Sequence, residues 1–148
     1  MPCVALAFCH FGHNQFIARG RFAMADQRDT VAELRQLVDQ FVQERNWAQF
    51  HNPKNLSMAL AIEAAELMEH FQWLDLDESR AVAGDAERLA AVGEELADVV
   101  CYALALANAL KLNVADSVRA KMIKNSQKYP AAEFHGRWGM GDRRTPEA

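Results

Sequence analysis

Two pairs of acidic residues are spaced so that both members of each pair lie on one face of an α-helix. Glu63 and Glu66 are three positions apart, and so are Glu95 and Asp98. Residues at this spacing are neighbours on a helix surface. Sites built only from carboxylate oxygens select Mg²⁺ or Mn²⁺ rather than zinc. Binding of a divalent cation is therefore the first chemistry that these four residues indicate.

Each acidic pair adjoins a nonpolar helix face. On a helical wheel, Glu63 falls inside the nonpolar arc of its segment, and Glu66 lies at the edge of that arc. Glu95 and Asp98 lie beside the nonpolar stripe of a later segment, on the same face as Tyr102. The nonpolar residues are Leu56, Leu60, Leu67, Phe71 and Leu74 in the first segment, and Val92, Leu96, Val99, Ala103, Leu106 and Leu110 in the second.

Acidic groups that point toward a helix interface need a counter-charge. Taking a carboxylate out of water costs roughly several kcal/mol unless it is paired or bound to a cation. No lysine or arginine lies on these faces, which favours a metal ion. Ordinary solvated acids are the alternative, because the chain has 20 acidic residues. A ferritin-like di-iron site is disfavoured, since it needs Glu-x-x-His on two helices, whereas His70 follows Glu66 by four positions.

The acidic pairs belong to a series of segments with helical periodicity. Four segments have nonpolar residues at steps of three and four, and the first follows a capping residue, Asp29 or Thr30. The later three cover about 53–73, 85–110 and 114–129. No segment alternates in the manner of a β-strand. The sequence therefore predicts an all-α protein, a four-helix antiparallel bundle that oligomerisation completes by covering the remaining nonpolar surface.

The last of these segments carries basic and polar side chains on one side. Lys121, Asn125, Lys128 and Tyr129 recur there at helical steps. Such a face could contact a polyphosphate, and a solvated basic surface is the alternative interpretation.

Flat side chains and one histidine lie near the segments that carry the acids. Trp47, Trp73 and Tyr102 are candidates for stacking on a nucleobase, although most aromatic residues simply pack in a core. His51 could bond a sugar or a phosphate. The sequence contains no Ser-His-Asp or Cys-His arrangement and no glycine-rich phosphate loop.

Composition limits the remaining possibilities. The chain has 148 residues, of which 51% are hydrophobic and 24% charged, as expected for one folded domain. A net charge of −4 argues against a surface built for a nucleic acid polymer. Three cysteines without CxxC spacing suggest neither a disulfide framework nor a zinc site. No segment is an apolar membrane span, so we expect no membrane partner and a cytoplasmic location.

The ends of the chain lack periodicity. We expect residues 1–25 to be a flexible tail, and Met24 to be a candidate for the natural start of translation. Residues 26–130 form the expected domain, and residues 131–148 a second flexible tail.

Three stretches of the sequence resemble the MazG-like all-α pyrophosphohydrolases, in particular their dCTP pyrophosphatase branch. They are ERNWAQFHNPKNLSMALAIEAAELMEHFQW, EELADVVCYALALA and KMIKNSQKYP, and the similarity covers about Leu34 to Pro130. The resemblance implies hydrolysis of a nucleoside triphosphate, such as dCTP or a modified pyrimidine nucleotide, to a monophosphate and pyrophosphate. It also implies a role in nucleotide-pool clean-up and a homo-oligomer, a dimer or tetramer.

The resemblance further implies a role for each candidate residue. Glu63, Glu66, Glu95 and Asp98 would hold magnesium, and Glu63 or Glu66 would take the proton of the attacking water. Contacts to phosphate or sugar would come from Lys121, Asn125, Lys128 and Tyr129. The base and sugar pocket would be lined by Trp47, Trp73 and Tyr102, with His51 as a further candidate. Eukaryotic relatives carry a histidine where this chain has Val38, which puts a cytosine preference in question. The alternative is a catalytically silent bundle that binds nucleotides or a partner.

Overall fold

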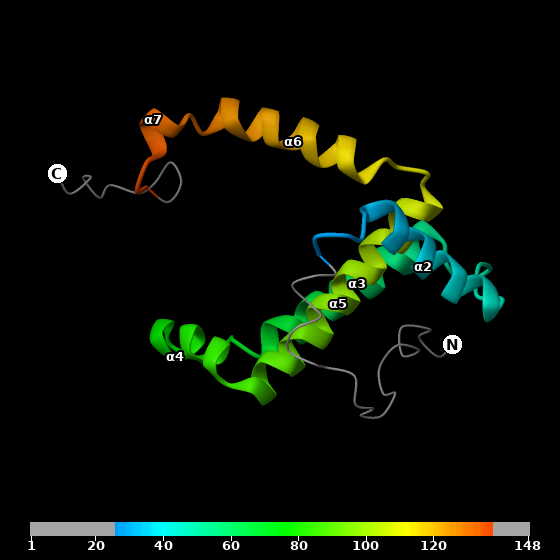
Figure 1. Cartoon of the computed structure of the whole chain (residues 1–148), viewed down its shortest axis with the longest axis horizontal. Helices are drawn as coiled ribbons and strands as arrows, with labels where there is room; N and C mark the ends of the chain where they lie inside the picture. Colours follow the sequence, from blue (N-terminus) through cyan, green and yellow to red (C-terminus); the bar gives the residue numbers. More distant parts are fainter. Residues whose placement is uncertain (1–25, 138–148) are drawn as a thin grey trace. The chain divides into compact units, whose positions relative to one another are not determined.

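The computed structural model describes residues 26–137, and within this range every regular element is a helix (Figure 1). The elements are α2 (Val31–Glu44), α3 (Pro53–Glu69), α4 (Leu76–Ala81), the short 3₁₀ helix η2 (Val82–Gly84), α5 (Ala86–Ala109), α6 (Val114–Lys128) and α7 (Ala131–Phe134). The all-α class expected from the sequence is confirmed for these residues. The predicted tail 1–25 lies outside the described residues, and α7 lies within the segment predicted to be the second tail.

Polar side chains cap the N-termini of the helices that build the site. Thr30 Oγ1 accepts a hydrogen bond from the Glu33 backbone N–H, and the Glu33 carboxylate accepts from the Thr30 N–H at 2.6 Å. This reciprocal capping box selects Thr30 over Asp29 as the cap. Helix α3 follows the cap Asn52 and has proline at its first position, where a missing N–H costs nothing. Asp85 caps α5.

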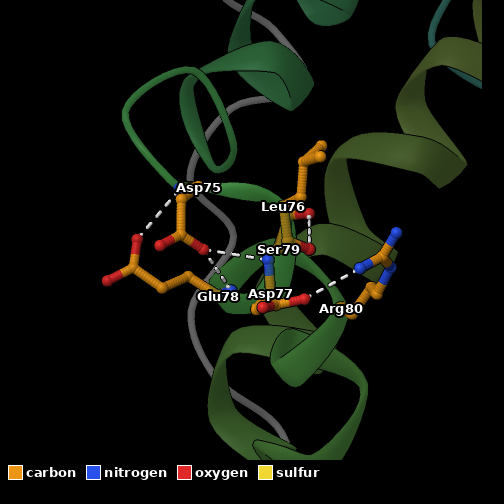
Figure 2. A network of polar contacts seen from close by, with 6 residues as sticks. All are labelled: Asp75, Leu76, Asp77, Glu78, Ser79 and Arg80. Atoms are coloured by element: carbon orange, nitrogen blue, oxygen red, sulfur yellow. Dashed lines mark hydrogen bonds and ion pairs between the residues drawn. The ribbon is translucent and has the colours of Figure 1, made fainter.

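The acidic connector between α3 and α5 contains the capped helix α4 (Figure 2). Asp75 Oδ1 accepts from the backbone N–H groups of Asp77 and Glu78, at 2.9 and 2.8 Å. The Glu78 carboxylate accepts from the Asp75 N–H at 2.9 Å, which completes a second capping box. Helix α4 has six residues and buries none of their side chains. These local hydrogen bonds therefore define where it begins.

The described residues form two compact units, divided between Leu112 and Asn113, and the first of them contains α2, α3 and α5. Helix α3 packs along α5, and α2 contacts α5 as well (Figure 1). The nonpolar core of this unit comprises Val38, Val42, Leu56, Ala59, Val82, Tyr102, Leu104, Ala105 and Ala107. The α3–α5 pair thus brings together the two helices that carry the acidic pairs.

A polar contact joins α2 to the C-terminal part of α5. The Arg35 Nε donates to Asn108 Oδ1 at 2.7 Å, and Asn108 Nδ2 donates to the Arg35 backbone carbonyl at 3.0 Å. The Arg35 guanidinium also reaches the Ala107 carbonyl at 3.5 Å. These bonds, which we call the Arg35–Asn108 clasp, link positions 72 and 73 residues apart in the chain. The clasp therefore fixes the spacing of the two helices near the end of α5.

Helix α6 belongs to the second unit and buries none of its side chains. Asn113 caps it, and it exposes Val118, Met122 and Ile123. The four-helix bundle and the oligomer predicted from the sequence therefore stay predictions. None of the helices in residues 26–137 combines the length and nonpolar character needed to cross a membrane.

Candidate functional site

The packing of α3 against α5 gathers three of the four predicted acidic residues. Glu63 and Glu66 from α3 and Glu95 from α5 each place a carboxylate oxygen within 4.8 Å of the others. Asp98 lies one helical turn beyond Glu95 on α5 and is not a member of this group. We call Glu63, Glu66 and Glu95 the acidic trio.

Glu63 is the most deeply buried member of the trio. Its side chain is 0% exposed, and neither of its carboxylate oxygens has a hydrogen-bond partner among the described residues. One oxygen of Glu95, Oε2, is likewise buried without a partner there. Native proteins rarely leave buried polar atoms unsatisfied, because each one costs about 1–3 kcal/mol and more when it is charged. The position of Glu63 inside a nonpolar arc, expected from the sequence, is confirmed.

Burial and mutual repulsion favour the protonated forms of these acids. Burial is the main cause that raises the pKa of Glu63 to about 7, and the negative charge of neighbouring carboxylates, Asp98 first, acts in the same direction. Burial also raises the pKa of Glu95, although the charge of His70 opposes this shift. The pKa of Asp98 is raised by burial and then by Glu66. Asp98 is thus electrically coupled to the trio although it lies outside it.

The donor set of the trio fits a divalent cation. It offers only carboxylate oxygens, which suit Mg²⁺ or Mn²⁺. Three of these oxygens are buried and have no hydrogen-bond partner within residues 26–137, and the like charges of the three carboxylates lie close together. A cation with two positive charges would satisfy those oxygens and remove the repulsion that raises the pKa values.

A cavity of about 210 Å³ opens next to α2, the loop that follows it, and the end of α5. Its nonpolar lining comes from Val38, Val42, Ala48, Ala105 and Ala109, and its polar lining from Asp39, Gln43, His51 and Asn108. Of these residues, the sequence singled out His51 as a binding residue. Asp39 and Gln43 were missed, because a polar residue on the exposed side of a helix looks like any solvated position until its tertiary neighbours are known.

One face of α5 carries both Asp98 and the residues of this helix that line the cavity. Asp98, Tyr102, Ala105 and Ala109 follow one another at steps of four, three and four, so they form one stripe along the helix. Asp98 and Ala105 are separated by roughly 10 Å along the helix axis. The sugar and phosphates of one nucleotide can span this distance.

The predicted aromatic residues occupy three different environments. Tyr102 is buried in the stripe of α5 that carries Asp98. Trp47 packs edge to face against Phe41, with the ring centroids 5.8 Å apart, and its carbonyl oxygen lies 2.9 Å from His51 Nδ1. Trp73 follows α3 and is 86% exposed. All three residues lie in the first unit, but only Tyr102 and Trp47 pack against other residues, whereas the ring of Trp73 is exposed.

The predicted phosphate-binding residues all lie in the second unit. Lys121 and Asn125 are on α6, and Lys128 ends that helix. The Lys128 ammonium lies 5.1 Å from the centre of the Tyr129 ring, a cation–π contact. Lys121 and Lys128 are both exposed to solvent, where an anionic ligand could reach them.

Comparisons with known proteins agree with the chemistry of the site. The model of the MazG-like family matches residues 58–138. The dCTP pyrophosphatase 1 of Rattus norvegicus is 39% identical over 119 residues, which cover 80% of this chain and 69% of that protein. The dCTP pyrophosphatase 1 of Homo sapiens is 38% identical over 120 residues, covering 81% and 70%. The crystal structure of a pyrophosphatase from Archaeoglobus fulgidus superposes with a TM-score of 0.63 and 37% identity, over 78% of this chain and 99% of that one.

Proposed function

Because the chain belongs to the MazG-like family, we propose that it is a Mg²⁺-dependent nucleoside triphosphate pyrophosphohydrolase. It cleaves a nucleoside triphosphate to the monophosphate and pyrophosphate, with dCTP or a modified pyrimidine nucleotide as the substrate. The relatives from Rattus norvegicus and Homo sapiens are dCTP pyrophosphatases, and the similar structure from Archaeoglobus fulgidus is that of a pyrophosphatase. Its role is to clean the nucleotide pool.

The observation that carries this proposal is the acidic trio, whose buried oxygens find no hydrogen-bond partner in the part of the chain that the structure describes. A merely structural cluster would place such carboxylates in water or pair them with a cationic side chain. Glu63, Glu66, Glu95 and Asp98 are the proposed ligands of Mg²⁺, and Mn²⁺ is an alternative occupant. When bound, the cation offsets the charge of the phosphate oxygens and makes water a better nucleophile.

The side chains of this chain supply the remaining steps. Glu63 or Glu66 takes the proton from the attacking water, since both carboxylates belong to the proposed cation site. Lys121, Asn125, Lys128 and Tyr129 hold the phosphates or the sugar as hydrogen-bond donors.

The base and sugar are the part of the substrate that the aromatic residues would hold. Trp47, His51, Trp73 and Tyr102 are the proposed contacts, and the cavity that His51 lines is the proposed seat of the base. The exposed Trp73 and the exposed nonpolar residues of α6 favour a homo-oligomer, a dimer or tetramer, in which copies share the site.

Conservative substitution of the acids tests the proposal. Glu63→Gln and Asp98→Asn keep the side-chain size and remove the charge. With dCTP and Mg²⁺, we expect pyrophosphate release to fall by about a hundredfold or more in both variants. Glu69→Gln is the matched control, because Glu69 is an exposed acid at the end of α3, and it should retain the wild-type rate.

Two results would count against the proposal. Wild-type rates in Glu63→Gln would show that the buried carboxylate has no part in the reaction. Mg²⁺-dependent nucleotide binding without turnover, for every nucleotide tested, would instead identify a catalytically silent binding protein.

A further inference from the structure

We propose that Arg45 is a positioning residue for the nucleotide: it stacks on Phe41 and so fixes the ring of Trp47, a proposed contact of the substrate. Arg45 ends α2 and directly precedes the loop that carries Trp47. The inference rests on the proposed function, because only there does Trp47 contact a nucleotide. It adds a residue that acts on the nucleotide through its neighbours rather than by touching it.

The chain reverses direction directly after α2, and the reversal brings Trp47 back onto the helix. Asn46 has a φ of 53°, in the left-handed region. Its N–H donates to the Gln43 carbonyl at 2.9 Å, and the Trp47 N–H donates to the Val42 carbonyl at 3.0 Å. These two bonds form a Schellman motif, which commonly packs the side chain after the turn against one near the helix end. Here Trp47 packs against Phe41, with ring centroids 5.8 Å apart and planes inclined by 74°.

Arg45 holds the Phe41 side of this contact. The Arg45 Cζ lies 3.6 Å from the centre of the Phe41 ring, and Nη1 donates to the Phe41 carbonyl at 3.1 Å. Nη1 also lies 3.5 Å from the Glu44 carboxylate, but this exposed ion pair contributes little. A flat guanidinium suits stacking on an aromatic ring. Arg45 therefore restrains the ring against which Trp47 packs.

The backbone of Trp47 extends the arrangement to His51. The Trp47 carbonyl accepts from the Phe50 N–H at 2.9 Å, and it also lies 2.9 Å from His51 Nδ1. The His51 N–H in turn donates to the Ala48 carbonyl at 3.2 Å. Trp47 and His51 are both proposed nucleotide contacts. A change in how Trp47 packs would thus affect two contacts together.

Order in the free protein determines how much freedom is lost on binding. Side chains that are already fixed lose less when the nucleotide binds, so we expect Arg45 to strengthen binding without changing the chemical step. A direct contact of the guanidinium with the triphosphate is the competing explanation. A positioning role requires Phe41 and acts on every ligand with the same nucleoside. A phosphate contact requires neither Phe41 nor the nucleoside.

Arg45→Gln tests the inference in the full chain with Mg²⁺. We expect the KM for dCTP to rise about fivefold and kcat to stay within about twofold, as the loss of one cation–π contact that orders a binding residue allows. The inhibition constant of dCMP, which lacks the β and γ phosphates, should rise by the same factor. Arg80→Gln is the matched control. It also removes a positive charge from an exposed arginine, one that pairs with Asp77 on α4, and should leave both constants unchanged.

Two further measurements show whether Arg45 acts through its neighbours. In a Phe41→Leu background, Arg45→Gln should raise the KM by less than about twofold, because the ring through which Arg45 acts is absent. In a proton–nitrogen NMR spectrum, the indole N–H signal of Trp47, assigned with Trp47→Phe, should shift in Arg45→Gln and not in Arg80→Gln. Thermal unfolding of each variant checks that it is folded.

The outcomes separate this inference from the function on which it rests. An unchanged Trp47 signal in Arg45→Gln overturns the inference, and this measurement requires no turnover. An unchanged KM overturns it as well. An equally large effect in the Phe41→Leu background, or an effect on dCTP without one on dCMP, would instead make Arg45 a phosphate contact. If the wild type releases pyrophosphate from no nucleotide, the proposed function itself fails, and the role of Arg45 in nucleotide binding falls with it.

Discussion

Glu63 places a carboxylate where neither water nor a hydrogen-bond donor of the described chain reaches it. The sequence predicted this placement, because a helical wheel needs only the three-and-four periodicity of α3 and Glu63 falls within its nonpolar arc. The sequence also predicted the neighbours Glu66 and Glu95, since two helices with acids beside nonpolar stripes bring those acids together when they pack. It did not reveal that Asp39 lines a cavity, because the other lining residues, His51 and the end of α5, lie near Asp39 only in the folded chain.

The raised pKa of Glu63 makes the stability of the metal-free protein depend on pH. The pKa is 4.5 for an ordinary glutamate and about 7 in the folded chain, so folding favours the protonated form. Below pH 4.5 Glu63 has no effect on stability, and between pH 4.5 and 7 it destabilises the fold increasingly. At about 1.4 kcal/mol per pH unit, the loss approaches about 3.5 kcal/mol above pH 7. Urea unfolding with a metal chelator, between pH 4.5 and 8, should show this decline.

Glu63→Gln is neutral at every pH and should flatten the decline, whereas Glu69→Gln should keep it. Glu95 and Asp98 also have raised pKa values and contribute a decline of the same sign, so the comparison between variants isolates Glu63. Equal slopes for the wild type and Glu63→Gln would contradict this assignment of the buried charge.

At the scale of elements, sequence and structure agree on where most helices begin. Thr30, Asn52, Asp85 and Asn113 are polar residues whose side chains accept from backbone N–H groups one turn ahead, and such caps are visible in a sequence. The end of α3 differs from the prediction. The nonpolar period continues to Leu74, but the helix ends at Glu69, and residues 70–73 form a turn in which the Phe71 and Gln72 N–H groups both bond to the Met68 carbonyl.

The Arg35–Asn108 clasp could not be predicted, because it joins helices through side chains 73 positions apart. We expect Asn108→Ala to destabilise the first unit by about 1–3 kcal/mol, since it leaves partly buried groups of Arg35 unsatisfied. Urea unfolding at constant pH measures this loss. Gln36→Ala is the control: it truncates an exposed side chain on the same helix and should change stability by no more than about 0.5 kcal/mol. Equal effects of the two variants would mean that the clasp does not hold α2.

At the scale of the whole molecule, the two compact units carry different parts of the proposed chemistry. The first unit contains the acidic trio and the cavity, and the second contains the basic residues of α6. The sequence predicted four helices of about the observed lengths. The sequence could not predict what packs against α6. This helix buries none of its side chains, and its nonpolar periodicity does not specify which surface would cover it. The four-helix bundle, the catalytic domain at residues 26–130 and the homo-oligomer remain predictions.

The central claim is that this chain breaks the bond between the α and β phosphates of a nucleoside triphosphate with a cation held by its acids. Phosphorus NMR of the products formed from dCTP by the full chain, with Mg²⁺ and with a chelator, tests it most directly. The account predicts dCMP and pyrophosphate in equal amounts with Mg²⁺, and neither with the chelator. Formation of dCDP and orthophosphate, or the same products at the same rate without a divalent cation, would contradict it.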